Sequence, residues 1–525
     1  MLSRVKTVFF LYLISFLISP VLAQAPLNAL TFNVSSFVIN GENPIGDKAQ
    51  KVLQPYLGEQ SGLEGLSAAA DALEQAIIDA GFSFHRVSLP PQALDSGTVE
   101  FSVVRFSIGS IDISGNEYFD KANIESSLPQ LRVGSTPNTK ELSRSLKLGN
   151  NHASKNVVLR FSEGGEGDTI DANLTVQDQN PQIFFVTLDN TGSEETEEFR
   201  STFGYQHGNL FNRDHSLTAT LTVAPEDPDA TTQVGINYHV PMYAHGATLD
   251  FLFSDSEINS GEVGSGIAIT GKGSVIGASY TRPLLSDSNF NHQWSVGVQA
   301  KTFENEQDLS GSVFVSDVLS FPVKLGYGFT HNSQSGNISG GLALSSNIDS
   351  GSNNSDEDYA SVRQGADNGW SAINYSLAYD LLIAGNWLFL AGLAGQESDD
   401  LLIPGEQFGV GGSSTLRGFE ERSVTGDSGY QVSFELWTPD YAGSRFLFFI
   451  DMASLEFNAA PGGGDRRGTA ADGRHRDGHR PDRTDTGPGP AAAAVHVGHA
   501  AARDGRTAPG RQGSRRSGCR RSDDL

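Results

Sequence analysis

The arginine at position 417 has the surroundings of a residue that makes a specific ion pair. It lies in the run Leu416-Arg417-Gly418-Phe419, where Gly418 permits a tight backbone turn. Arginine presents a rigid fork of N–H donors that suits a carboxylate. The run predicts a loop tip whose arginine binds an acidic side chain elsewhere in the fold. An ordinary exposed Arg-Gly turn is the alternative.

A candidate acidic partner, Asp451, lies in a strand-like run. Side chains alternate along a strand, so Asp451 shares one face with Phe449 and Ala453. If the opposite face meets lipid, Asp451 points to the inside of a barrel, as does Glu435 in another alternating run. A loop folded into the barrel could then be anchored through Arg417 to Asp451. In a wet interior such a pair contributes only about 0–1 kcal/mol, so its predicted role is positional.

No catalytic, cofactor-binding or metal-binding constellation emerges from the sequence. The glycines at 409, 411 and 412 could suggest a phosphate-binding loop, but no helix pattern follows them and no βαβ pattern surrounds them. The histidines are scattered and lack the spacing of a metal ligand set. We therefore expect no enzyme activity, no cofactor and no metal.

The first residues predict export from the cytoplasm. Arg4 and Lys6 precede an apolar run from Val8 to Ile18, and small residues follow at positions where a signal peptidase cuts. A membrane-spanning helix needs about 20 apolar residues, more than this run offers. Residues 1–25 are predicted to be a cleaved signal peptide, with an uncleaved anchor as the alternative.

Composition narrows the class of protein further. The net charge of −26 argues against a nucleic-acid partner, because nucleic-acid-binding proteins carry basic faces. Cys519 is the sole cysteine, which excludes an internal disulfide framework. The folded chain must therefore be held together by hydrogen bonding and packing.

The region after the leader predicts two copies of one α/β unit. Residues 27–104 show a strand pattern, two helix patterns and two strand patterns, with an apolar helical stripe that includes Leu63, Leu66, Leu73 and Ile77. The same order begins again in residues 105–179, and each opening strand ends at a glycine, Gly41 or Gly115. One larger α/β domain is the alternative.

Residues 181–458 predict an antiparallel transmembrane β-barrel. About thirteen runs of roughly ten residues alternate apolar with polar or small side chains, as strands tilted across a bilayer do. In one run, Leu217, Ala219 and Leu221 alternate with threonines. Segments rich in Asp, Asn, Gly and Ser separate the runs, as expected of external loops. A soluble β-sandwich or propeller, which also alternates, is the alternative.

Several short motifs, in this order, resemble those of two-partner secretion transporters, the haemolysin activation/secretion protein family. The tandem units resemble polypeptide-transport-associated (POTRA) domains. The matching runs are Val87 to Gly97, Leu188-Asp189-Asn190-x-Gly192, Gln407 to Gly412 with Leu416-Arg417-Gly418-Phe419, Gly426 to Tyr430 with Glu435, and Phe449-x-Asp451-x-Ala453. Ala453 replaces the last glycine of the family's F-x-D-x-G pattern.

The resemblance implies α+β periplasmic POTRA domains followed by a barrel of about sixteen strands in a Gram-negative outer membrane. It implies a loop that folds into the barrel, carries Arg417 and is anchored on Asp451. The implied partners are an unfolded exoprotein client with an N-terminal secretion domain, outer-membrane lipid and the barrel-assembly machinery. A POTRA-containing insertase, which usually has more docking units, and a passive porin, which needs none, are the alternatives.

Residues 459–525 do not continue the barrel pattern. They are rich in Arg, Gly, Ala, Pro and Asp, and no alternating strand is evident in them. This composition predicts either a disordered basic tail or a shifted reading frame in GC-rich coding DNA. The resemblance implies about three further strands in nearly the same length, which favours the shifted frame.

Overall fold

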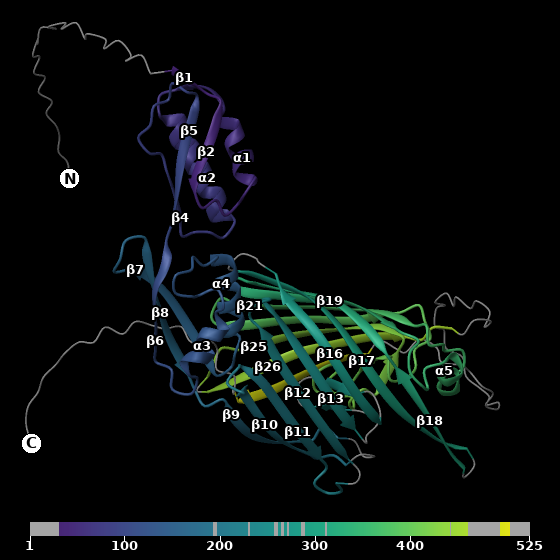
Figure 1. The fold of residues 1–525 in the computed structure, drawn as a ribbon. Helices are drawn as coiled ribbons and strands as arrows, with labels where there is room; N and C mark the ends of the chain where they lie inside the picture. The colour runs from purple at the N-terminus through teal and green to yellow at the C-terminus, as the bar shows by residue number, and fades with distance from the viewer. Residues whose placement is uncertain are drawn as a thin grey trace, which may run out of the picture. The chain divides into compact units, whose positions relative to one another are not determined.

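A computed structural model describes the fold of most of the chain (Figure 1). The described residues are 31–192, 197–228, 231–256, 261–263, 267–269, 272–284, 289–309, 312–441, 443–459 and 494–503. The predicted signal peptide lies outside them. The chain divides into two compact units, Met1–Ser107 and Ile108–Leu525.

The first compact unit contains a strand, two helices and two strands in the expected order. We call this part of it the first α/β unit. Its elements are β1 (Thr31–Val34), β2 (Ser36–Gly41), α1 (Lys48–Leu53), η1 (Gln54–Tyr56), β3 (Gly58–Ser61), α2 (Glu64–Asp79), β4 (His85–Ser88) and β5 (Thr98–Arg105). The sheet has the order β2-β5-β4, with β2 parallel and β4 antiparallel to β5. The pairing of β1 with β3 was not predicted.

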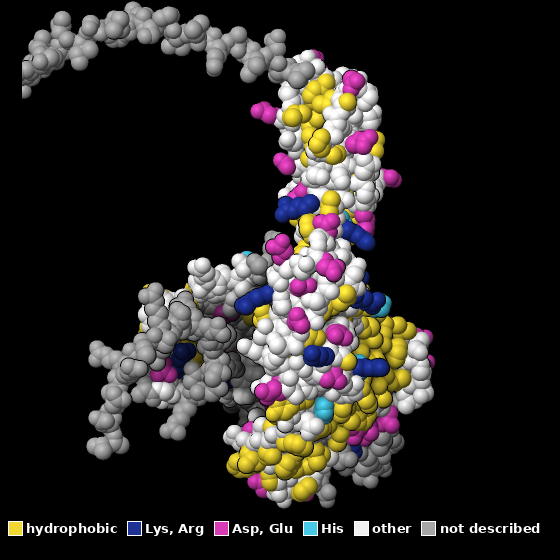
Figure 2. All heavy atoms as spheres, turned by 60° about the vertical axis from the view of Figure 1, so that its left-hand side comes forward, with side chains coloured by type: hydrophobic (Ala, Val, Ile, Leu, Met, Phe, Trp, Pro, Cys, Tyr) yellow, Lys and Arg dark blue, Asp and Glu magenta, His cyan; other side chains and the backbone are white. Residues whose placement is uncertain are grey.

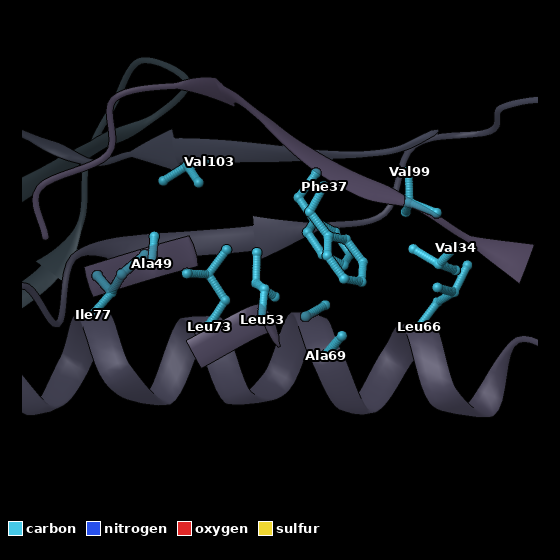
Figure 3. Close-up of a cluster of buried hydrophobic side chains, with 12 residues drawn as sticks. Val34, Phe37, Ala49, Leu53, Leu66, Ala69, Leu73, Ile77, Val99 and Val103 are labelled. Atoms are coloured by element: carbon cyan, nitrogen blue, oxygen red, sulfur yellow. The ribbon is translucent and has the colours of Figure 1, made fainter. Parts of the chain in front are cut away.

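The core of the first α/β unit lies between α2 and the sheet (Figure 3). Leu66, Leu73 and Ile77 are fully buried on α2, because residues at this spacing share one helix face. Leu63, predicted to belong to this stripe, precedes the helix and is 59% exposed. The apolar spacing includes Leu63, one position before α2 begins, so periodicity alone placed the start of the helix too early.

A second α/β unit repeats this plan. Its elements are β6 (Ser107–Ser114), α3 (Lys121–Ser127), α4 (Thr139–Asn150), β7 (Lys155–Glu163) and β8 (Thr169–Asp178), with sheet order β6-β8-β7. Gly41 and Gly115 have positive φ angles of 99° and 82°. A Cβ would lie 2.2 Å from the Val103 carbonyl oxygen in one case and 2.5 Å from that of Val176 in the other. Equivalent positions in the two units therefore require glycine for the same reason.

One large antiparallel sheet follows the second α/β unit. Its strands are β9 (Gln182–Asp189), β10 (Arg200–Leu210), β11 (His215–Val223), β12 (Thr232–Met242), β13 (Ala247–Ser256), β16 (Gly273–Pro283), β17 (Phe290–Leu309), β18 (Ser312–Ser320), β19 (Pro322–Asn332), β20 (Gly336–Asn347), β21 (Ser371–Ile383), β22 (Trp387–Glu397), β25 (Ser428–Trp437), β26 (Ser444–Glu456) and β27 (Ala494–Arg503). β18 extends the hairpin that β17 makes with β19. Apart from β18 and β27, the thirteen predicted strands are present.

The two faces of the large sheet differ as the alternation predicted. Thr220 and Thr222 of β11 are buried, whereas Leu221 between them is 41% exposed. Figure 2 shows hydrophobic side chains gathered over the outward surface of these strands. No helix within the described ranges has the length and apolarity to cross a membrane.

The tail departs from the prediction in one segment. The structure places β27 within residues 459–525, antiparallel to β26 from Ser444↔Arg503 to Ala453↔Ala494. The expectation that no strand forms in the tail is therefore wrong for these residues. β26 offers an edge of unpaired backbone groups, which a passing segment can pair with whatever its composition. The origin of the tail stays a prediction.

Candidate functional site: a loop folded onto the last strands

The candidate site is built by the segment that joins β22 to β25. Within this segment, β23 (Phe408–Val410) pairs with β24 (Val424–Gly426), and residues 411–423 form the tip between them. The tip binds side chains of β25 and β26. Asp451, which Arg417 of the tip binds, lies five residues before β26 ends at Glu456. Asp451 and Glu456 are separated by about 17 Å along the strand. We call this segment the re-entrant loop.

Arg417 at the tip binds two acidic residues from two strands. Its Nε and one terminal nitrogen donate to the Asp451 carboxylate, each at 2.6 Å. Its other terminal nitrogen donates to Glu435 Oε1 at 2.6 Å. The guanidinium carbon also lies 3.7 Å from the centroid of the Phe449 ring. A planar fork that is bonded on both edges and stacked on one face has a single orientation.

Asp451 is fully buried, so the environment of the pair is not the wet interior expected. Its carboxylate accepts the two Arg417 side-chain bonds, a 3.2 Å bond from the Arg417 backbone N–H and a 2.8 Å bond from Ser433 Oγ. A buried carboxylate left without its cation costs about 3–5 kcal/mol, far more than an exposed pair contributes. The pair therefore constrains the tip more strongly than predicted.

The remaining motif residues shape and pack the tip. Leu416 is 2% exposed and packs in one cluster with Ala453 of β26. Gly418 has a φ of 91°, the left-handed conformation that the turn requires. Phe419 is 40% exposed, and its backbone carbonyl accepts a bond from the Gly412 N–H. The structure thus brings together every predicted site residue, with the Phe419 side chain outside the bonded network.

A second anchor at the base of the re-entrant loop was not predicted. Asp427 is fully buried, and its carboxylate accepts hydrogen bonds from both terminal nitrogens of Arg363, one of them at 2.7 Å. It also accepts the backbone N–H groups of Leu402 at 3.0 Å and Asn458 at 2.7 Å. One carboxylate therefore fixes the loop base to the end of β26 and to a neighbouring loop.

An apolar cluster formed by α5, neighbouring loops and strand residues positions Arg363. Helix α5 (Asp356–Val362) begins with a capping box at Ser355 and Asp358, and Arg363 follows its last residue. Tyr359 of this helix is fully buried against Trp370 and Leu402. Asp427 belongs to the family-like run from Gly426 to Tyr430, but Arg363 lies 64 residues earlier in a loop without a recognisable motif. Only the folded structure shows that they meet.

Replacing Asp427 with alanine should loosen the loop base. The substitution leaves the half-buried Arg363 guanidinium without its carboxylate and removes the acceptor of two backbone N–H groups. In whole cells we expect trypsin to cleave the variant at Arg422 at least tenfold faster than the parent. Asp399→Ala, an exposed acidic residue of the same loop, is the matched control. Equal cleavage of both variants and the parent would contradict the role of Asp427.

Within the parts of the chain that the structure describes, no group of three His, Cys, Asp or Glu side chains is arranged to hold a metal ion. At the tip, ion pairs hold the side chains in position.

The fold and this loop define a class of outer-membrane transporters that carry POTRA domains. The family model for haemolysin secretion/activation proteins (ShlB/FhaC/HecB) matches residues 168–475, more than half of the chain, and a ShlB-type POTRA domain model matches residues 32–105. The chain belongs to this family. It is a two-partner secretion transporter of the outer membrane, with its POTRA domains in the periplasm.

Individual relatives are distant but extend over most of the chain. The heme/hemopexin transporter protein HuxB of Haemophilus influenzae (strain 86-028NP) is 21% identical over 77% of this chain and 72% of its own length. The outer membrane transporter CdiB of Escherichia coli O6:K15:H31 is 22% identical over 79% and 71%. The solved structure of CdiB from Escherichia coli has a TM-score of 0.64 at 17% identity and covers 85% of this chain and 84% of that one. That likeness confirms the predicted fold class.

Proposed function

We propose that the protein docks one dedicated exoprotein in an unfolded state on its α/β units and passes it through the barrel lumen. The observation that carries the docking step is the outer edge of β7. Asn150 of α4 donates to the Val157 carbonyl at 2.8 Å and accepts from the Val157 N–H at 2.7 Å. A side-chain amide thus imitates a partner strand at the first position of this edge.

The rest of the β7 edge is suited to an extended client. Backbone groups alternate in direction along a strand, so those of Leu159 point the same way as those of Val157. Val158 is 40% exposed, which adds apolar surface beside the edge. Strand addition reads main chain more than side chains, as binding of an unfolded protein requires.

The lumen offers a path that continues from this region. A cavity of about 630 Å³ reaches from α4 of the second α/β unit to the tip of the re-entrant loop. Most of its lining is uncharged, with hydroxyl, amide and glycine positions that include Gln293, Gly341, Ser376, Thr415 and Ser433. Such a lining can exchange hydrogen bonds with an extended backbone without binding it tightly.

The proposed partners follow from this route. They are a client with an N-terminal secretion domain, outer-membrane lipid around the barrel and the barrel-assembly machinery, with no nucleic acid. Transport by binding and geometry requires no catalytic step, and folding of the client outside the cell would prevent its return. An insertase of the same general plan is the alternative. The two α/β units favour an exporter, because insertases of this plan usually carry more.

Replacing Leu159 with proline tests the docking edge. Proline removes the outward N–H of Leu159 and should lower export of a co-expressed large exoprotein at least tenfold. Leu159→Ala, which loses the side chain but keeps the N–H, is the matched control and should export more than the proline variant. The measurement is client in the medium relative to barrel in the membrane. The parent first has its codons after Asn458 resequenced and any shifted frame restored.

If the proline and alanine variants export equally, main-chain pairing at β7 is not the docking contact. If the parent exports no exoprotein while its barrel is assembled, the proposed function itself is wrong.

A further inference from the structure

A buried ion pair joins the second α/β unit to the first periplasmic turn of the barrel. Lys155 of β7 and Asp214, which follows β10 in the turn, have side chains that are 0% and 1% exposed. Lys155 Nζ lies 2.5 Å from Asp214 Oδ2. Burial lowers the pKa of Lys155, and the charge of Asp214 opposes that shift. The two charges are therefore held as a pair inside the junction.

Two further side chains complete the bonding of this pair. Asn123 of α3 donates to Asp214 Oδ1 at 2.8 Å and accepts from Lys155 Nζ at 2.9 Å. Tyr243, in the turn between β12 and β13, donates its hydroxyl to Asp214 Oδ2 at 2.6 Å. Asp214 has a φ of 60°, a conformation that aspartate tolerates better than most residues. The site thus combines residues of the second α/β unit with residues of two successive barrel turns.

Contacts around the pair extend over the same junction. The Nε2 atom of His152 bonds the Gly208 carbonyl, and its Nδ1 accepts from the Ser154 N–H at 3.0 Å. This pattern fits a neutral ring, and burial lowers the pKa of His152. Ser145 of α4 donates to the Tyr243 carbonyl at 3.2 Å. The junction is therefore polar and specific rather than a smooth apolar surface.

Such a junction tolerates very few relative positions of its two sides. Full separation would return both charges to water, and full seating pairs them. A slide of a few ångströms would leave Lys155 and Asp214 buried without partners, which is strongly unfavourable. The ion pair therefore fixes the position of the second α/β unit on the barrel more than it strengthens the binding between them.

We infer that Lys155, Asn123, Asp214 and Tyr243 are positioning residues that keep the second α/β unit seated on the barrel mouth while the client passes. This inference rests on the proposed function, because it concerns transport of that client. The seated unit keeps the β7 edge and the lumen cavity in one fixed relation. A client strand then enters the lumen in a defined orientation. Movement of the protein during transport takes place in parts other than this junction.

A disulfide between α4 and the second barrel turn provides the first test. A Cβ on Gly246 would lie 3.1 Å from Cγ of Arg144, and one further C–C bond of about 1.5 Å puts the two Cβ atoms within about 4.7 Å, which is in disulfide reach. Residues 1–458 contain no cysteine, and Cys519→Ser removes the sole thiol of the chain if the frame after Asn458 is unchanged. We expect oxidised Arg144→Cys/Gly246→Cys protein to export client within twofold of its reduced form. Export that stops on oxidation and returns on reduction would overturn the inference.

The second test asks whether Lys155 acts through seating. Lys155→Met should lower export at least tenfold, slow formation of the 144–246 disulfide and leave the amount of inserted barrel unchanged. Once the disulfide has formed, export by the Lys155→Met protein should recover. Lys140→Met, at an exposed position of α4, is the matched control and should change neither quantity. Loss of export that the disulfide does not rescue would show that Lys155 does something other than seat the unit.

Failure of this inference is distinguishable from failure of the proposed function. If the reduced parent exports client but the oxidised form does not, the docking and transport proposal stands and the seating inference falls. If neither form of an assembled parent exports client, the proposed function falls first.

Discussion

Replacing Arg417 with alanine is expected to reduce export at least tenfold while the barrel remains in the membrane. The substitution removes the cation that binds the fully buried Asp451, and it leaves Glu435 with only the bond from the Trp437 indole N–H. An uncompensated buried charge costs about 3–5 kcal/mol, enough to displace the loop tip. Client in the medium and heat-modifiable barrel on a gel are the two measurements. Glu420→Ala, at an exposed position of the same tip, is the control.

The partner residue should show a smaller effect. In Asp451→Ala, Arg417 keeps its bond to Glu435 and its stacking on Phe449, so part of the anchor remains. The double variant should be no worse than Arg417→Ala, because it also removes the buried carboxylate that had lost its cation. Losses that add fully in the double variant would show that the two residues do not act as one unit.

Deleting residues 27–104 is expected to abolish export without preventing insertion of the barrel. The first α/β unit has its own buried core and belongs to a compact unit that ends at Ser107. Its removal therefore leaves the Lys155–Asp214 junction intact. We expect at least a tenfold loss of secreted client, measured against barrel in the membrane.

A point substitution separates loss of the domain from a change in chain length. Leu73→Asp places an unpaired charge at a fully buried position and should reproduce the deletion. Lys51→Asp, on the exposed side of α1, should export like the parent. Export that survives both the deletion and Leu73→Asp would mean that the first α/β unit does not participate in docking.

Most of the fold was predicted from the local periodicity of apolar and polar residues. The strands of the barrel were recognisable because lipid and lumen impose opposite demands on alternate residues, as Leu221 and Thr222 illustrate. Glycine at the end of β2 and β6 marked the repeat, because a carbonyl approaches both positions too closely for a side chain. β27 was missed because its pairing comes from the open edge of β26 rather than from its own pattern.

Long-range polar contacts were less predictable, and the candidate site shows why. Arg417 and Asp451 were paired from a resemblance and a face argument, but the burial of Asp451 is evident only in the fold, where Leu416 of the tip packs in one cluster with Ala453. Arg363 and Lys155 gave no signal, because a charged residue in a loop or at the start of a strand is usually exposed. Each is buried by a segment distant in the sequence, and no local pattern encodes that contact.

The Lys155–Asp214 pair also has a consequence for the order of assembly. Lys155 belongs to the second α/β unit, while its carboxylate partner arrives only when β10 and β11 have formed their hairpin. Until then the ammonium group must remain hydrated, so the side of β7 that carries it cannot complete its packing. The final folding of this periplasmic unit is therefore coupled to the closure of the hairpin of β10 and β11. The periplasmic unit therefore completes its packing only once this part of the barrel has formed.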